Sequence, residues 1–122
     1  MTSTVKMTDQ ERIALQRSVT AAHIQGECDG DYEFVRSTFV QDDRAYFDAA
    51  PGGLRLFGTG GVADWYVILS SVLPDLQITV THEYVGVGCC LREMTASSTH
   101  SAEFAGIKPE GRFVTWEAIS TR

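Results

Sequence analysis

The feature that most constrains this chain is a change of hydrophobic period at Pro74. Before the proline, apolar residues recur at helical spacing from Val62 to Val72, behind a glycine-rich start in which Thr59 suits a helix N-cap. From Asp75 onward, apolar and polar residues alternate, which is typical of a strand with one covered face. The sequence therefore predicts a helix that leads directly into a strand.

The remainder of the C-terminal half predicts two more strands. Gly86-Val87-Gly88 supplies a tight reversal, and residues 89–98 return as a β-rich run with both faces at least partly covered. A loop around Thr99-His100 closes at Pro109-Glu110-Gly111-Arg112, after which residues 113–121 alternate as a strand. One face of the strand that begins at Asp75 is predicted to carry Leu76, Ile78, Val80, His82 and Tyr84.

The N-terminal half begins with two predicted helices. Thr8 fits the N-cap of a first helix that we expect to end at Gly26, and Asp31 fits the N-cap of a short second helix. Residues 1–7 are expected to be disordered. His23 lies near the end of the first helix and is interpreted as a surface or packing residue, because one histidine at a helix end specifies nothing.

A short strand is predicted next. Residues 44–49 alternate, and the bend Pro51-Gly52-Gly53 ends them. Residues 54–57 form a short second strand or only the approach to the next helix.

Composition restricts the class of protein. A chain of 122 residues folds as one domain (1–122), and its net charge of −6 with ten scattered Lys and Arg disfavours a nucleic-acid partner. No apolar run or leader directs the chain to a membrane or out of the cell, so we expect a cytoplasmic protein. Cys28, Cys89 and Cys90 lack metal-type spacing and are interpreted as buried, reduced thiols. No motif for a nucleotide, a metal or another cofactor is present.

Several short motifs occur together in a known order. Leu73-Pro74-Asp75-Leu76 follows a helix, a returning strand enters residues 99–107, and Pro109-Glu110-Gly111-Arg112 precedes the last strand. From about Asp9 onward the chain resembles the SnoaL-like polyketide cyclases of the nuclear-transport-factor-2-like superfamily. The resemblance implies an α+β cone, in which a bent antiparallel sheet wraps around the N-terminal helices and leaves a pocket in its mouth.

The resemblance also raises a question about the last strand. In the resembled family a further strand follows the one at residues 113–121, whereas this sequence stops at Arg122. The resemblance therefore implies a final strand that the sequence given lacks, and we expect either an incomplete or disordered C-terminus, which we favour, or a strand from a partner chain. The family also implies a homodimer.

Asp48 is the first catalytic candidate. It lies between Phe47 and Ala49 before the Pro-Gly-Gly bend, where partial desolvation would raise the pKa of a carboxylate and suit it to act as a general base. It resembles the catalytic aspartate of the ketosteroid-isomerase branch, although the first helix lacks that branch's tyrosine. The alternative is a carboxylate that caps the turn.

His100 and Glu117 are the other catalytic candidates. The resemblance implies that the histidine of the Thr-His motif lies in the pocket with an acid from the next strand, and Glu117 is the only acid on residues 113–121. Such a pair can share a proton for enolisation or aldol ring closure without a cofactor. The alternative is that His100 caps the loop and Glu117 faces solvent.

Six further residues are candidates for the substrate-binding wall, with core packing as the alternative for each aromatic one. They are Tyr46, Trp65, Tyr66, His82, Met94 and Trp116. Arg92 and Glu93 occupy opposite faces of their strand. In limonene-epoxide-hydrolase-like members of the superfamily, a buried arginine with acids orients water for epoxide opening. The Asp-Arg-Asp spacing of those members is absent here.

Two classes of function stay open at this point. One is a cofactor-independent acid-base enzyme that cyclises or isomerises a small hydrophobic oxygenated substrate, or opens an epoxide. The other is a module that binds such a molecule, or assembles with a partner, without turnover.

Overall fold

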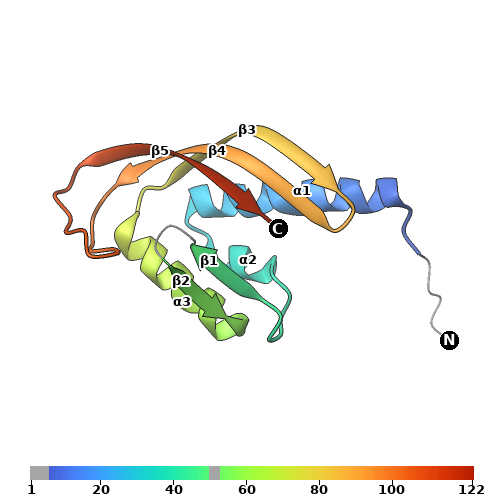
Figure 1. The fold of residues 1–122 in the computed structure, drawn as a ribbon, viewed down its shortest axis with the longest axis horizontal. Coiled ribbons are helices and arrows are strands. Elements are labelled where there is room, and N and C mark those ends of the chain that lie inside the picture. The colour runs from blue at the N-terminus through green and yellow to red at the C-terminus, as the bar shows by residue number, and fades with distance from the viewer. Residues whose placement is uncertain (1–5, 50–52) are drawn as a thin grey trace.

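The computed structural model describes residues 6–49 and 53–122, which form two layers (Figure 1). Five of the residues expected to be disordered, 1–5, and most of the predicted Pro51-Gly52-Gly53 bend lie outside the described residues. Within the described ranges, helices and antiparallel strands follow one another in the order expected from the sequence. The predicted α+β class is confirmed.

The upper layer is a curved antiparallel sheet that arches over a long helix (Figure 1). Its strands are β3 (Gln77–Gly86), β4 (Cys89–Thr99) and β5 (Phe113–Thr121), in that spatial order. The helix is α1 (Asp9–Asp29), which packs against β3 and α2.

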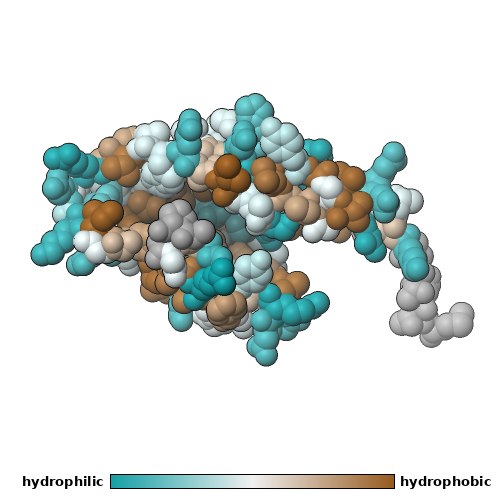
Figure 2. Space-filling view, in the orientation of Figure 1, coloured by the Kyte–Doolittle hydropathy of each residue, from teal (hydrophilic) through white to brown (hydrophobic). Residues whose placement is uncertain are grey.

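The lower layer holds the remaining elements. They are α2 (Tyr32–Ser37), the antiparallel hairpin of β1 (Tyr46–Ala49) and β2 (Leu54–Phe57), and α3 (Gly58–Val72). In the described part of the chain the hairpin does not join the larger sheet, and β5 pairs only with β4. The sheets are not closed into a barrel. Figure 2 shows hydrophilic and hydrophobic side chains intermixed over the visible face.

The helix caps follow the sequence at two of the predicted positions. The Thr8 side chain accepts a bond from the amide three residues later, as predicted, and Asp31 does the same for α2. The expected end of α1 at Gly26 is wrong, because α1 continues to Gly30, whose φ of 72° forms the C-cap. Gly26 instead permits close packing, since a Cβ there would lie 2.8 Å from Cγ2 of Val35.

The predicted N-cap of α3 is also wrong. α3 begins at Gly58 directly after β2, so Phe57 is the N-cap and no side chain caps the helix. The φ of 73° at Gly58 provides the sharp turn from strand to helix.

A β-bulge changes the predicted facing of β3. The register shifts between Val80 and His82, so the alternation reverses beyond that point. Glu83 and Val85 are therefore half-buried, whereas His82 and Tyr84 are exposed, contrary to the predicted apolar face. The bulge thus places a carboxylate, and not a histidine, on the covered side of the sheet.

The hydrophobic core lies between α2, α3, the hairpin and the sheet. Trp65 stacks on Phe47 at a ring separation of 4.1 Å, which fixes the hairpin against α3. The buried core residues are Val35, Ala45, Val62, Trp65, Tyr66, Leu69, Leu76 and Ala96.

Asp75 ties the start of β3 to the end of β4. Its carboxylate accepts bonds from the Ser98 hydroxyl at 2.6 Å, the Thr99 amide at 2.7 Å and the Thr99 hydroxyl at 2.8 Å. These bonds, the Ser98 hydroxyl first among them, lower the pKa of Asp75 to about 2. The Pro-Asp motif therefore serves as a structural junction between helix, strand and loop.

The described residues contain neither a membrane-spanning helix nor a group that could bind a metal ion. No helix in residues 6–49 or 53–122 is both long and apolar enough to cross a membrane. Over the same residues, no group of three or more His, Cys, Asp or Glu could hold a metal ion.

Cys28 is half-buried and Cys90 buried, but Cys89 is exposed, so the expectation of three buried thiols is wrong for Cys89.

Candidate functional site

The three predicted catalytic residues lie in different places. Asp48 lies on the solvent side of the hairpin, where its carboxylate pairs with Arg55 at 3.1 Å, and it lacks the desolvated surroundings that we expected. Glu117 is exposed on the outer face of β5. His100 is half-buried just after β4, and its amide donates to the Arg112 carbonyl. No hydrogen bond or ion pair within the described ranges joins the three side chains.

Strand alternation explains two of these positions. Phe47 points inward onto Trp65, so Asp48 points outward. Trp116 packs against the core, so the adjacent Glu117 faces solvent.

The predicted wall residues divide into three groups. Tyr46 and His82 are exposed, and His82 pairs with Glu93 on the outer face of the sheet at 3.0 Å. Trp65 and Trp116 belong to the core or pack against it, and Met94 shares the inner face of β4. Tyr66 lies with its hydroxyl 3.4 Å from Nε2 of the buried His23.

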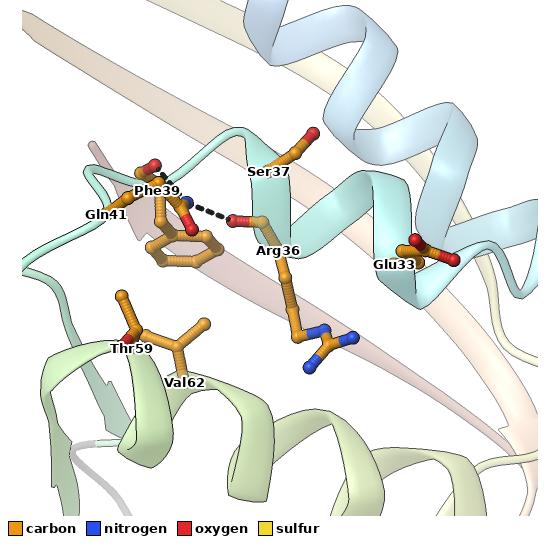
Figure 3. A pocket seen from close by; sticks show the side chains of 7 residues that line it. All are labelled: Glu33, Arg36, Ser37, Phe39, Gln41, Thr59 and Val62. Carbon is orange, nitrogen blue, oxygen red and sulfur yellow. Dashed lines mark hydrogen bonds between the residues drawn. The ribbon is translucent and has the colours of Figure 1, made fainter.

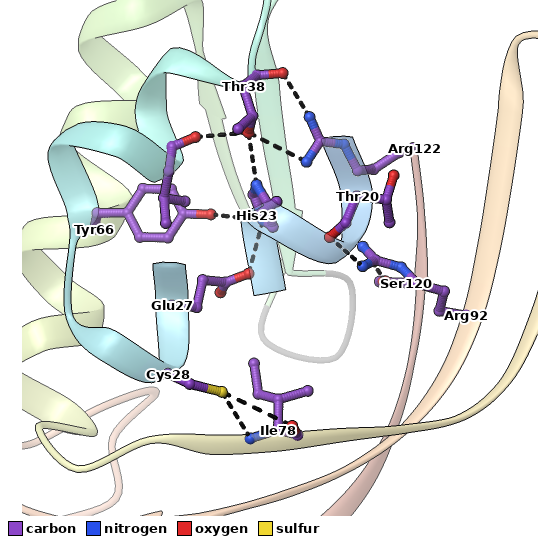
Figure 4. A network of polar contacts seen from close by, with 11 residues as sticks. Thr20, His23, Glu27, Cys28, Thr38, Tyr66, Ile78, Arg92, Ser120 and Arg122 are labelled. Carbon is purple, nitrogen blue, oxygen red and sulfur yellow. Dashed lines mark hydrogen bonds and ion pairs between the residues drawn. The ribbon is translucent and has the colours of Figure 1, made fainter. Parts of the chain in front are cut away.

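This histidine belongs to a polar cluster between α1, α2, α3 and the inner face of the sheet (Figure 4). We call it the interior cluster. It comprises His23, Glu27, Thr38, Tyr66, Arg92 and Arg122.

Thr38 defines the tautomer of His23. The Thr38 hydroxyl lies 2.7 Å from the Val35 carbonyl and 2.7 Å from Nδ1 of His23. When the hydroxyl donates to the carbonyl, which can only accept, Nδ1 is the donor to the hydroxyl oxygen. We infer this tautomer, with a proton on Nδ1 of His23.

Glu27 faces the other ring nitrogen of His23. Nε2 of His23 lies 2.7 Å from Oε1 of Glu27, and two acceptors at that separation would repel each other, so one proton lies between the two atoms. The two groups therefore form a pair that can pass a proton from one to the other.

Burial and a tyrosine adjust this pair. His23 is 5% exposed, and this burial, more than any neighbouring charge, lowers the pKa of His23. The hydroxyl of Tyr66 lies 3.4 Å from Nε2 of His23, and burial raises the pKa of Tyr66, so the tyrosine stays a hydrogen-bond donor. The site thus contains an acid-base pair and, next to it, a neutral hydrogen-bond donor.

Aromatic rings enclose the pair. Phe39 lies 5.6 Å and Tyr66 6.5 Å from His23 between ring centroids, and Tyr32 stacks on Tyr66 at 5.4 Å. Such walls exclude water and strengthen the electrostatic interactions inside.

An open groove lies beside this enclosure (Figure 3). It has a volume of about 270 Å³ and runs between α2 and α3. Phe39 and Val62 form its apolar part, while Glu33, Arg36 and Thr59 supply polar groups. Because Phe39 also faces His23, its ring separates the groove from the interior cluster.

The sequence interpretation missed this site by excluding His23. Glu27 follows His23 by four residues, a spacing that places both on one face of a helix, but the predicted helix end at Gly26 left Glu27 outside the helix. Burial of that face, however, depends on Tyr66 and Arg92, which are far away in the sequence.

Comparisons with known proteins give the fold. No family model and no curated protein matches the chain. AclR from Streptomyces galilaeus, assigned as a hydroxylase, matches with a TM-score of 0.72 at 16% identity, over 89% of this chain and 69% of its own. A protein from Shewanella putrefaciens CN-32, assigned as a SnoaL-like polyketide cyclase, matches at 0.68 with 13% identity over 95% and 79%.

The chain has the SnoaL-like fold. SalBIII, an epoxide hydrolase/cyclase-like enzyme with a role in pyran ring formation in the polyether salinomycin, shares it at a TM-score of 0.71, with 14% identity over 88% of this chain and 78% of its own. The fold predicted from the sequence motifs is thereby confirmed. At these identities the similarity establishes the fold and leaves the reaction to be argued from the site.

Proposed function

We propose that this protein is a cofactor-independent acid-base enzyme that acts on a small hydrophobic, oxygenated molecule in the interior of the fold. The single observation that carries the proposal is the His23–Glu27 contact of 2.7 Å with its shared proton. A buried pair that holds one mobile proton can give it to one atom of a substrate and accept another.

The proposed mechanism needs three groups. The shared proton passes to a carbonyl or ether oxygen of the substrate, while the other member of the pair removes a proton from carbon or water. The Tyr66 hydroxyl donates a hydrogen bond to the oxygen on which negative charge develops. Cyclisation, isomerisation and epoxide opening all consist of such proton movements.

The groove between α2 and α3 is the proposed entrance. Rotation of the Phe39 side chain would connect the groove with His23, because the ring borders both. The apolar part of the groove suits a hydrophobic substrate.

The fold relatives support this class of chemistry. SalBIII is described as epoxide hydrolase/cyclase-like, and the Shewanella protein is assigned to the polyketide cyclases. A homodimer and a cytoplasmic location, both expected from the sequence, stay predictions.

The second candidate is a module that binds the same kind of molecule without turnover. It is favoured by the near-complete burial of His23 and Tyr66, which an enclosed structural network would also show. The two candidates differ in whether a bound ketone exchanges protons with water.

The test uses probes that require only a base and an acid. We would follow hydrogen-deuterium exchange at the α-carbons of 2-tetralone by mass spectrometry, and opening of styrene oxide in ¹⁸O-labelled water. The proposal predicts acceleration of at least one reaction, with a loss of about 10²–10⁴-fold in His23→Gln. His82→Gln, which alters an exposed histidine that also pairs with a glutamate, is the matched control and should leave the rate unchanged.

Tyr66→Phe keeps the ring and serves if His23→Gln fails to fold; its rate should fall about tenfold or more. Binding of 2-tetralone without acceleration of either reaction would favour the binding module. Equal rates in wild type and a folded His23→Gln would remove the pair from the mechanism.

A further inference from the structure

Arg92 is a buried cation that forms no ion pair with the residues that the structure describes. It is 2% exposed on the inner face of β4, and its Nη1 donates to the Thr20 carbonyl at 3.2 Å. Its Nη2 lies 3.5 Å from the Ser120 hydroxyl, which is a weak contact. Its buried Nε has no hydrogen-bond partner in residues 6–49 and 53–122. An unsatisfied donor on a buried guanidinium is costly and needs an explanation.

Arg122 brings a second guanidinium to the same cluster. It donates to the carbonyl of Thr38 at 2.6 Å and to its hydroxyl at 3.3 Å, and it lies 5.3 Å from the centroid of the Phe39 ring. None of these partners carries a negative charge. Burial lowers the pKa of both arginines, but guanidinium groups stay charged at neutral pH.

The acids near these arginines pair with other residues. Glu27 pairs with His23 at 2.7 Å and forms no ion pair with either arginine. Glu83 lies opposite Arg92 in the strand register, but its carboxylate pairs with Arg17 at 2.8 Å. Among the described residues, neither guanidinium group therefore has an ion-pair partner.

Figure 4 shows Arg122 and His23 joined through Thr38, whereas Arg92 bonds separately to Thr20 and Ser120 in the same interior. Arg122 and Nδ1 of His23 both contact the Thr38 hydroxyl oxygen. An anion held by the arginines would therefore lie beside the acid-base pair. Phe39, which borders the groove, also borders Arg122.

We propose that the ligand of the interior carries an acidic group, a carboxylate or an ionised enol, that the guanidinium groups of Arg92 and Arg122 bind. The free Nε of Arg92 supplies one donor, and the two guanidinium groups, which form no ion pair within the described residues, supply the electrostatic attraction. This inference rests on the proposed function in that both use the same interior, and it narrows the substrate to a hydrophobic acid.

The experiment compares an acid with its neutral counterpart. Binding of 2-naphthoate and of 2-naphthamide is measured by isothermal titration calorimetry at pH 7.5 on the full chain. We expect the acid to bind at least tenfold more tightly than the amide. Arg92→Met should abolish this preference, whereas Arg112→Met, at an exposed arginine paired with Glu110, should retain it.

A second measurement separates ligand binding from a structural role. Arg92→Met removes an unsatisfied buried charge, so without ligand its melting temperature should be no lower than that of the wild type. Arg122→Met, at a half-buried position, provides a second test of the same loss of preference if Arg92→Met does not fold.

The outcomes are distinct from those for the proposed function. A tenfold preference for the acid that persists in His23→Gln supports the anion site even if no turnover is found. Equal binding of acid and amide, binding of neither, or a preference that survives in both Arg92→Met and Arg122→Met would overturn the inference.

Discussion

Replacing Glu27 by glutamine separates two possible charge states of the interior cluster. In the state that we infer, one proton lies between Glu27 and His23 and the pair is neutral. In the other state, Glu27 is a bare carboxylate beside a neutral His23 and is the counter-charge of Arg92 and Arg122. The glutamine has nearly the same shape as the acid but never ionises.

The two states predict different losses of stability. If the pair is neutral, the glutamine amide can donate to Nε2 of His23 and the net charge of the cluster does not change. The loss is then about 1 kcal/mol, the value of one exchanged hydrogen bond. If Glu27 is a carboxylate, the substitution removes a negative charge that stabilises both Arg92 and Arg122. The expected loss is then about 3–5 kcal/mol.

Urea denaturation at pH 7.5, followed by tryptophan fluorescence, measures this difference. Trp65 and Trp116 both pack in or against the core and report its unfolding. Glu93→Gln, in the exposed pair with His82, is the matched control and should change stability little. A loss of 3 kcal/mol or more in Glu27→Gln would refute the shared proton.

Two further predictions concern stability. Gly26→Ala would place Cβ 2.8 Å from a buried valine of α2 and should lower the free energy of unfolding by about 1–3 kcal/mol. Gly60→Ala, where the added Cβ meets no atom within 4 Å, should not destabilise the protein. Equal effects of the two substitutions in urea denaturation would contradict the packing at Gly26. The pKa of Asp75 is about 2 in the folded protein, so its contribution to the free energy of unfolding is complete above about pH 4 and is lost as the pH falls toward 2. The melting temperature of Asp75→Asn should therefore depend less on pH between about 4 and 2 than that of the wild type. The same pH dependence in both proteins would count against the junction.

Local patterns in the sequence predicted the fold well. The period change at Pro74, the caps at Thr8 and Asp31, and the alternation of residues 113–121 each depend on neighbours along the chain. They are confirmed because helix caps and strand alternation need no distant partner.

The site could not be predicted in the same way. The prediction that His82 lies on the covered face of its strand was wrong. A bulge, which leaves no clear mark in the sequence, reverses the alternation of faces beyond Val80. The role of His23 depends on Thr38 and Tyr66, and only the packing of three helices brings these residues together. A residue's surroundings determine its chemistry, and here those surroundings come from distant parts of the chain.

The most direct test of the account is the protonation of the two ring nitrogens of His23. Long-range ¹H–¹⁵N correlation spectra of the ¹⁵N-labelled protein at pH 7.5 distinguish the tautomers, and His23→Gln identifies the signal. The account predicts a proton on Nδ1, the nitrogen that faces Thr38. A bare Nδ1 with the proton fixed on Nε2 would contradict the shared proton and, with it, the proposed acid-base site.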